Sequence, residues 1–147
     1  MSNANIVRSL LYAATSQSHD PDTQVGAVAR TVSGTWLVAG NRLPEGIAYD
    51  PALCERPAKY QWLEHAERAL VYRAAAVGVS LAGATMYLSW YPCVDCARAL
   101  VAVGFKRVYC QSPDFDHPRW GDEFKVAQAV LAAGGLEVRE LEEALAE

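Results

Sequence analysis

Apolar residues recur at helical spacing in several separate stretches of the chain. In the first stretch, Ile6, Leu10 and Ala14 share one helical face, and Ser2 or Asn3 before them provides an N-cap. The predicted helices span residues 3–17, 64–77, 92–103 and 122–133. A glycine directly follows each of the last three, as is common at helix C-termini.

Short runs rich in β-branched and aromatic residues alternate with these helices and predict strands. The predicted strands span residues 24–31, 36–40, 85–89, 106–110 and 136–139. Ser33-Gly34 favours a hairpin turn between the first two, which makes them antiparallel. Strands that alternate with helices after an opening hairpin predict an α/β layer fold, with a mixed five-stranded sheet flanked by helices.

The segment 41–63 shows no clear hydrophobic period and contains several prolines and glycines. A loop of this length in a compact domain is usually either functional or disordered. Because it directly precedes residues with metal-binding chemistry, we interpret it as a functional loop.

Length and charge restrict the expected partners. The 147 residues fit one domain, and we interpret 1–147 as a single unit. The net charge of −4 disfavours tight binding to a long phosphate backbone, so nucleic acid is not an expected partner. A single small nucleotide needs only a local basic pocket and stays compatible with this charge.

The N-terminal residues lack the basic-then-apolar pattern of a secretory signal, and no apolar run reaches membrane-spanning length. We therefore expect a cytoplasmic protein that does not bind membranes. In that compartment the four cysteines are expected to stay reduced, without a structural disulfide.

A histidine and a Cys-x-x-Cys pair, each at a predicted helix start, carry the strongest chemical signal. His65 offers a ring nitrogen, and Cys93 and Cys96 offer thiolates, a ligand set that tetrahedral Zn²⁺ accepts. Three protein ligands leave a fourth position open, as in catalytic zinc sites. Glu67 follows His65 closely enough to move protons between water and a substrate. The pattern predicts a Zn²⁺ cofactor, with Glu67 as the catalytic residue.

Each part of this pattern has a simpler interpretation when it is taken alone. His65 would be a hydrogen-bonded polar residue, Glu67 a solvated acid in a first helical turn, and the cysteines a redox pair. The cysteines could also form half of a structural zinc site, for which Cys54 is the nearest further ligand. Glu67 favours the catalytic interpretation, because a structural zinc ion needs no proton shuttle. An inactive, zinc-stabilised binding domain is the alternative from another functional class.

Motifs along most of the chain resemble the deoxycytidylate deaminase branch of the cytidine deaminase-like superfamily. The matching segments are Asp20-Pro21-Asp22-Thr23-Gln24-Val25-Gly26-Ala27, residues 40–46, Lys59-Tyr60, Glu64-His65-Ala66-Glu67, and residues 89–97 with Pro92-Cys93-Val94-Asp95-Cys96. The zinc motif is specific to the superfamily, and the first two segments select the branch. The resemblance implies a three-layer cytidine deaminase-like fold. It also implies hydrolytic deamination of deoxycytidylate (dCMP), or a close pyrimidine relative, to the uracil form with release of ammonia.

The same resemblance implies a set of substrate contacts. Asn41 would contact the sugar or base edge, and the backbone N–H of Ala66 would bind the pyrimidine carbonyl. The segment Ser89, Trp90 and Tyr91 would receive the amino group. Apart from the resemblance, Asn41 is also explained as a turn residue, and the two aromatic residues as packed side chains.

A nucleotide substrate requires a cationic site for its phosphate. The basic residues near the site by sequence are Arg42, Arg56, Lys59, Arg68 and Arg119. Arg56 and Lys59 are the leading phosphate contacts, because they lie in the long loop just before His65. Each of these residues, taken singly, is also explained as a solvated surface charge.

Two departures from the nucleotide-deaminase pattern leave the substrate open. Ala69 stands where nucleotide-acting members usually carry asparagine, and Arg42 replaces the glycine after Asn41. Both features resemble the tRNA adenosine deaminases. The alternative substrates are therefore a free nucleobase, a nucleoside or a tRNA adenosine, although the acidic charge counts against tRNA.

The last predicted helix also indicates a homo-oligomer. The chain has no charged residue from Val126 to Leu136, and 52% of all residues are hydrophobic. The resemblance points the same way, since deaminases of this superfamily commonly assemble through helices beside the active site.

Overall fold

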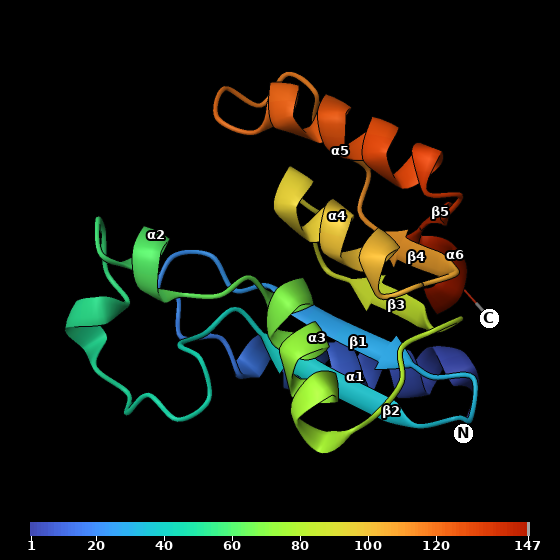
Figure 1. The fold of residues 1–147 in the computed structure, drawn as a ribbon, viewed down its shortest axis with the longest axis horizontal. Helices are drawn as coiled ribbons and strands as arrows, with labels where there is room; N and C mark the ends of the chain where they lie inside the picture. Colours follow the sequence, from blue (N-terminus) through green and yellow to red (C-terminus); the bar gives the residue numbers. More distant parts are fainter. Residues whose placement is uncertain (147) are drawn as a thin grey trace.

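A mixed five-stranded sheet with the order β2-β1-β3-β4-β5 forms the centre of the computed structural model, which describes residues 1–146 (Figure 1). Glu147, the last residue of the predicted domain, lies outside the described residues. The strands are β1 (Gly26–Arg30), β2 (Trp36–Gly40), β3 (Thr85–Leu88), β4 (Arg107–Cys110) and β5 (Glu137–Glu140). β1 is antiparallel to β2 and β3, whereas β3, β4 and β5 are parallel. The predicted mixed sheet is confirmed.

Four longer helices match the predicted ones to within about two residues at each end. They are α1 (Asn3–Ser16), α3 (Ala66–Val77), α4 (Val94–Ala102) and α5 (Gly121–Ala133). Three short elements were not predicted, because one or two turns carry too little periodicity to be recognised. They are the 3-10 turn η1 (Pro51–Leu53), α2 (Lys59–Trp62) and α6 (Leu141–Leu145).

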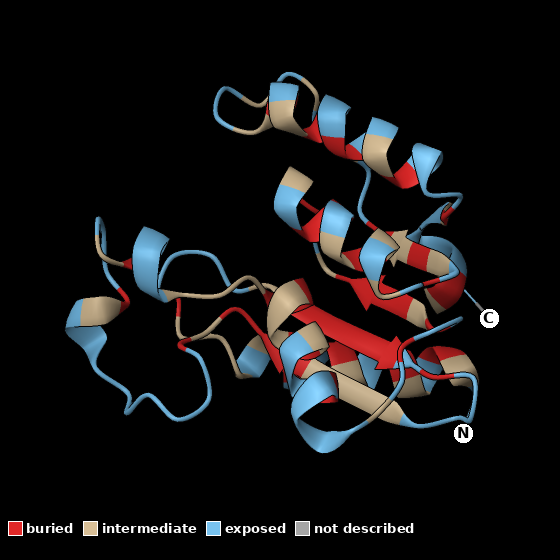
Figure 2. Ribbon diagram, in the orientation of Figure 1, coloured by how far each residue is buried: buried red, intermediate tan, exposed pale blue. Residues whose placement is uncertain are grey.

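Alternation along the strands divides the buried residues between two faces of the sheet. Val28 and Tyr87 pack with α1 and α6 on one face. Their neighbours Ala27, Met86 and Leu88 pack with α3, α4 and α5 on the other. Figure 2 shows β1 as buried along most of its length between these two layers. The arrangement confirms the predicted three-layer α/β fold.

The N-terminal ends of α4 and α5 lie on the same side of the molecule as the 41–63 segment that carries α2 (Figure 1). Because both predicted ligand groups are at helix starts, this side is where the functional residues gather. No helix within residues 1–146 is both long enough and apolar enough to cross a membrane.

Candidate metal centre and active-site cleft

The structure brings the three predicted zinc ligands together. The Nδ1 atom of His65 lies 3.4 Å from Cys93 Sγ and 3.5 Å from Cys96 Sγ. Tetrahedral Zn²⁺, with bonds of about 2.0–2.1 Å to nitrogen and about 2.3 Å to sulfur, places its nitrogen and sulfur ligands about 3.5 Å apart. The residues present therefore fit zinc in both donor type and spacing.

Two helix N-termini hold these ligands. His65 is the N-cap residue of α3, and Cys93 is the N-cap residue of α4. The first N–H groups of a helix lack partners within the helix and favour negative charge nearby. Hydrogen bonds from the Cys96 thiol and the His65 ring lower the pKa of Cys93 to about 4 despite its burial. A thiolate ready for a metal ion is the expected state of Cys93.

Cys54 does not join this group. It is buried at the end of η1, where its thiol donates to the Asp50 carbonyl at 3.4 Å. Among residues 1–146, the group of metal-binding side chains that converge consists of His65, Cys93 and Cys96. The geometry favours three protein ligands over a closed four-ligand site.

Glu67 lies in the first turn of α3 and is only 4% exposed. Burial raises the pKa of its carboxyl group. A raised pKa makes the neutral form of a carboxyl group easier to reach, which suits a group that must hold a proton and return it. The side chain therefore has the properties of a proton shuttle beside the three ligands.

Backbone pairing fixes the approach to His65. Arg42 and Glu64 form an isolated antiparallel bridge, with N–H···O distances of 3.0 and 2.8 Å. This bridge anchors the residue before the ligand to the end of the β2 segment. Arg42 thus acts through its backbone, and its side chain pairs weakly with Glu45 at 3.8 Å rather than lining the cleft.

A cleft of about 550 Å³ opens onto the metal centre. Its lining includes His65, Glu67 and Cys93. Further residues line it from the 41–63 segment, from residues 20–25 and from the loop before α5. The volume is within the range of small-molecule sites.

Ala66, Trp90 and Tyr91, three of the predicted substrate contacts, line this cleft. The backbone N–H of Ala66 is in the first turn of α3 and is available to a carbonyl oxygen. Trp90 is partly exposed, whereas Tyr91 is buried and packs edge-on against Phe124. Trp90 can therefore reach a substrate ring, and Tyr91 supports the wall behind it.

Asn41 and Ser89 are engaged in the fold itself. The Asn41 amide accepts from the Ser18 hydroxyl and the Val25 N–H, and donates to the Thr23 carbonyl. Asn41 also lines the cleft, so its side chain helps to shape the cleft wall. The Ser89 hydroxyl accepts from the Gly26 N–H at 2.9 Å. This hydroxyl helps to join the start of β1 to the residue after β3, and the contact of the Ser89–Tyr91 segment with the amino group stays a prediction.

The surroundings of Lys59 do not favour the phosphate contact that was expected of it from the sequence. The Lys59 side chain is 6% exposed, and its ammonium group lies 3.0 Å from Asp20 and 3.2 Å from Asp22. Two carboxylates therefore already neutralise it. Arg68 is likewise paired, with Glu64 and Asp95.

Two arginines at the cleft rim are available to bind an anion. Arg56 and Arg119 both donate to the Tyr60 hydroxyl, at 2.8 and 2.9 Å, and the Arg119 guanidinium lies 4.3 Å from the Tyr60 ring centre. Arg56 has a loose contact with Asp22 at 3.5 Å. Within residues 1–146, Arg119 has no carboxylate partner within 4 Å. Positive charge is thus concentrated at this rim around a neutral oxygen.

Sequence reasoning assigned no role to His117 and Trp120, which line the cleft from the loop before α5. The Nδ1 atom of His117 accepts from the N–H groups of Arg119 and Trp120, both at 3.1 Å, which holds the ring against its own loop. A Cβ atom at Gly121 would overlap the Phe115 carbonyl, so glycine allows this loop to close against the start of α5. The basic and aromatic residues within 117–120 are the sequence feature from which this wall of the cleft could have been predicted.

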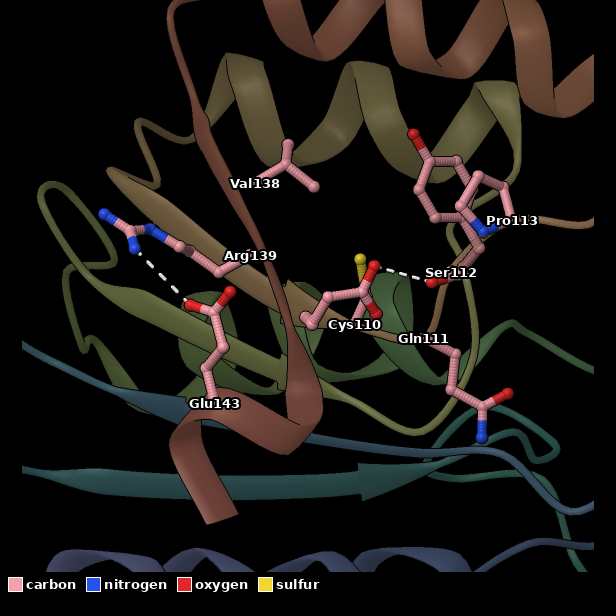
Figure 3. A pocket seen from close by; sticks show the side chains of 9 residues that line it. Cys110, Gln111, Ser112, Pro113, Val138, Arg139 and Glu143 are labelled. Atoms are coloured by element: carbon pink, nitrogen blue, oxygen red, sulfur yellow. Dashed lines mark hydrogen bonds and ion pairs between the residues drawn. The ribbon is translucent and has the colours of Figure 1, made fainter. Parts of the chain in front are cut away.

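A smaller pocket of about 150 Å³ lies at the ends of β4 and β5 (Figure 3). Cys110, Ser112 and Glu143 are among its lining residues, and the Ser112 hydroxyl donates to Glu140 across it. Arg139 is paired with Glu143 at 3.4 Å. This pocket is too small for a nucleotide and lacks the metal-binding group.

Comparisons with known proteins agree with the geometry. Residues 2–112 match the sequence model of a family described as the cytidine and deoxycytidylate deaminase zinc-binding region. The chain is 34% identical over 125 residues to an uncharacterized deaminase in the luxG 3′ region of Aliivibrio fischeri, covering 84% of this chain and 82% of that protein. It is 39% identical over 88 residues to the deoxycytidylate deaminase of Enterobacteria phage T2, covering 56% of this chain and 43% of the phage protein.

A solved structure shares the fold. It is the dCMP deaminase of cyanophage S-TIM5 in complex with dCMP and dUMP, with a TM-score of 0.69 and 22% identity. The superposition covers 95% of this chain and 99% of the phage chain.

Proposed function

Since the chain belongs to the cytidine and deoxycytidylate deaminase family, a family of zinc-binding hydrolytic deaminases, we propose that it converts dCMP to its uracil form with release of ammonia. The observation that carries the proposal is the convergence of His65, Cys93 and Cys96 beside the buried carboxyl group of Glu67. His65 and Cys93 face the cleft, so a metal held there is accessible to a small molecule.

His65, Cys93 and Cys96 would hold Zn²⁺, which when bound makes hydroxide available at neutral pH. Glu67 takes a proton from water and delivers it to the ring nitrogen next to the amino-bearing carbon. The water oxygen bonds to that carbon as a hydroxyl group, and Glu67 then takes the proton of this hydroxyl and passes it to the departing amine, which leaves the oxygen as the carbonyl of the uracil form. The C–N bond breaks, and ammonia leaves. The Ala66 N–H holds the pyrimidine carbonyl in place meanwhile.

The arginine pair at the rim supports a nucleotide over a nucleoside. Arg56 and Arg119 converge on the Tyr60 hydroxyl, and a phosphate oxygen can replace this neutral acceptor with a charged one. Lys59 is paired with Asp20 and Asp22. We therefore assign the second phosphate contact to Arg119 instead of Lys59. A charge-assisted contact of this kind contributes about 1.5–3 kcal/mol.

The two departures from the nucleotide-deaminase pattern lie away from the cleft lining. Ala69 is partly buried against the main hydrophobic core, and Arg42 contributes its backbone to the bridge with Glu64. Neither side chain lines the cleft. The residues at positions 42 and 69 therefore give no reason to exclude a nucleotide as the substrate.

Ammonia release from a panel of cytosine, adenine and guanine compounds, each as base, nucleoside and nucleotide, tests the proposal. We expect kcat/KM for dCMP to exceed that for deoxycytidine by at least roughly 10- to 150-fold, the equivalent of one of the two charged phosphate contacts. Equal turnover of deoxycytidine or cytosine would instead favour the free-base or nucleoside alternative.

A further inference from the structure

Arg68 connects the two segments that carry the metal ligands. Its Nε atom lies 2.6 Å from Glu64 Oε1, and its Nη1 atom lies 3.3 Å from Asp95 Oδ2. Glu64 directly precedes His65, and Asp95 stands between Cys93 and Cys96. One guanidinium group therefore spans from the start of α3 to the start of α4.

On the α3 side, the connection extends to the backbone of the metal ligand His65. The same Glu64 oxygen that binds Arg68 also accepts the N–H of His65 at 3.3 Å. On the α4 side, Asp95 binds Arg98 as well, but Arg98 belongs to α4 and does not reach α3. Within residues 1–146, Arg68 is the side chain whose ion pairs join these two helix starts.

The position of Arg68 also suits the charge of the site. Despite partial burial, which acts in the opposite direction, the Cys96 and Cys93 sulfurs and the Glu64 carboxylate raise the pKa of Arg68. Its side chain is 22% exposed, so water only partly screens its charge. The planar, fixed geometry of a guanidinium group suits it to two carboxylates at once.

We propose that Arg68 is a positioning residue that holds His65 and the Cys93–Cys96 segment at ligand spacing and raises the affinity for zinc. This inference rests on the proposed function in taking zinc as the catalytic metal. Groups that orient metal ligands typically change metal affinity by about 10- to 100-fold when they are removed.

Zinc affinity, measured by competition with a chromophoric chelator and without substrate, tests the inference. We expect Arg68→Gln to bind zinc about 10- to 100-fold more weakly than the unmodified protein. Arg98→Gln is the matched control, because it loses a pair with the same Asp95 but within α4, and it should stay within about twofold. The double variant Arg68→Gln/Asp95→Asn should lose less than the product of the two single losses.

The absorption spectrum of the cobalt-substituted protein gives a second readout. In Arg68→Gln we expect altered ligand-field bands, which report ligand geometry. Arg68→Lys, which keeps the charge but not the planar group, should bind zinc with intermediate affinity. If Arg68→Gln fails to fold, Asp95→Asn compared with Arg98→Gln makes the same test from the other end of the bridge.

Unchanged zinc affinity and an unchanged cobalt spectrum in Arg68→Gln would overturn the inference. A rise in KM for dCMP with unchanged zinc affinity would also overturn it and would place Arg68 in substrate binding. If the unmodified protein binds zinc but releases no ammonia from any compound, the proposed function fails, whereas the zinc measurements still decide the role of Arg68.

Discussion

The Lys59 ammonium group lies 3.0 Å from both carboxylate oxygens of Asp20, and both side chains are nearly removed from solvent. Asp20 also accepts the backbone N–H groups of Asp22 and Thr23. The pair therefore fastens α2 and the long 41–63 segment to the residues that lead into β1. The sequence segments around Asp20 and Lys59 thus each supply one half of a buried ion pair.

The protein should lose a measurable part of its stability in acid, when the carboxylate of Asp20 becomes protonated. Burial raises its pKa, but hydrogen bonds from Asp22, Lys59 and Thr23 outweigh this and lower the pKa of Asp20 below its ordinary value. Its contribution to stability is thus complete above the ordinary carboxyl pKa of about 3.9 and is lost as the pH falls through the lower folded value.

We expect Asp20→Asn to be destabilised by about 3–5 kcal/mol near pH 7, because the Lys59 charge stays buried without its main partner. The difference from the unmodified protein should shrink below about pH 4. Urea unfolding between pH 3 and pH 7 measures both effects. Asp22→Asn removes an exposed partner of the same lysine and should cost much less. Equal losses for the two variants would contradict a special role of Asp20.

Cys93→Ala should lose the metal and part of the stability. The three ligands lie on two helix starts, so binding energy is also folding energy. Metal analysis after dialysis and thermal unfolding, with and without added zinc, check this. Cys54→Ala removes a buried cysteine outside the metal-binding group and should keep full occupancy. A Cys93→Ala protein with one zinc per chain would refute the assignment.

Glu67→Gln should keep both the fold and the metal while kcat falls by about 10²- to 10⁴-fold. The amide has nearly the same shape as the buried carboxyl group but cannot carry the proton. Zinc content and ammonia release are measured on the same preparation. Activity close to that of the unmodified protein would rule out the proposed proton path.

Arg119→Gln and Arg56→Gln should weaken turnover of dCMP far more than turnover of deoxycytidine. Each removes one of the two guanidinium groups that meet at Tyr60, and we expect a roughly 10- to 150-fold loss in kcat/KM for the nucleotide. Arg30→Gln, on β1 away from the cleft, is the control for a general loss of charge. Equal losses on nucleotide and nucleoside would point to a structural role of the rim.

The protein should form a homo-oligomer at assay concentration. Most apolar residues of α5 face the chain's own core, since Phe124, Ala127 and Leu131 are buried, but Val126 stays exposed. Tyr72 and Val77 are likewise exposed on α3. Light scattering coupled to size-exclusion chromatography measures the mass. A monomer would contradict the prediction.

The features that depend on local spacing or on a recognisable set of metal-binding residues were predictable, and the pairings between other distant polar side chains were not. Periodicity located the long helices and strands, and the donor types of His65, Cys93 and Cys96 identified a metal group whose members do meet. The partners of Lys59 could not be predicted, because Asp20 lies 39 positions away and no local pattern links the two. The Arg119 contact with Tyr60 spans 59 positions and escaped recognition for the same reason.

The position of the ligands at two helix N-termini has a consequence for the order of maturation. Cys93 and Cys96 are neighbours along the chain, but His65 lies 28 positions before Cys93, with α3 and β3 between them. A chain in which β3 has not yet paired with β1 therefore offers a metal ion only two sulfurs. His65 and Cys93 line the open cleft, so the metal-binding group can be reached without opening the hydrophobic core. Metal exchange in the mature protein should accordingly proceed through the open cleft, at a rate set by ligand release rather than by global unfolding.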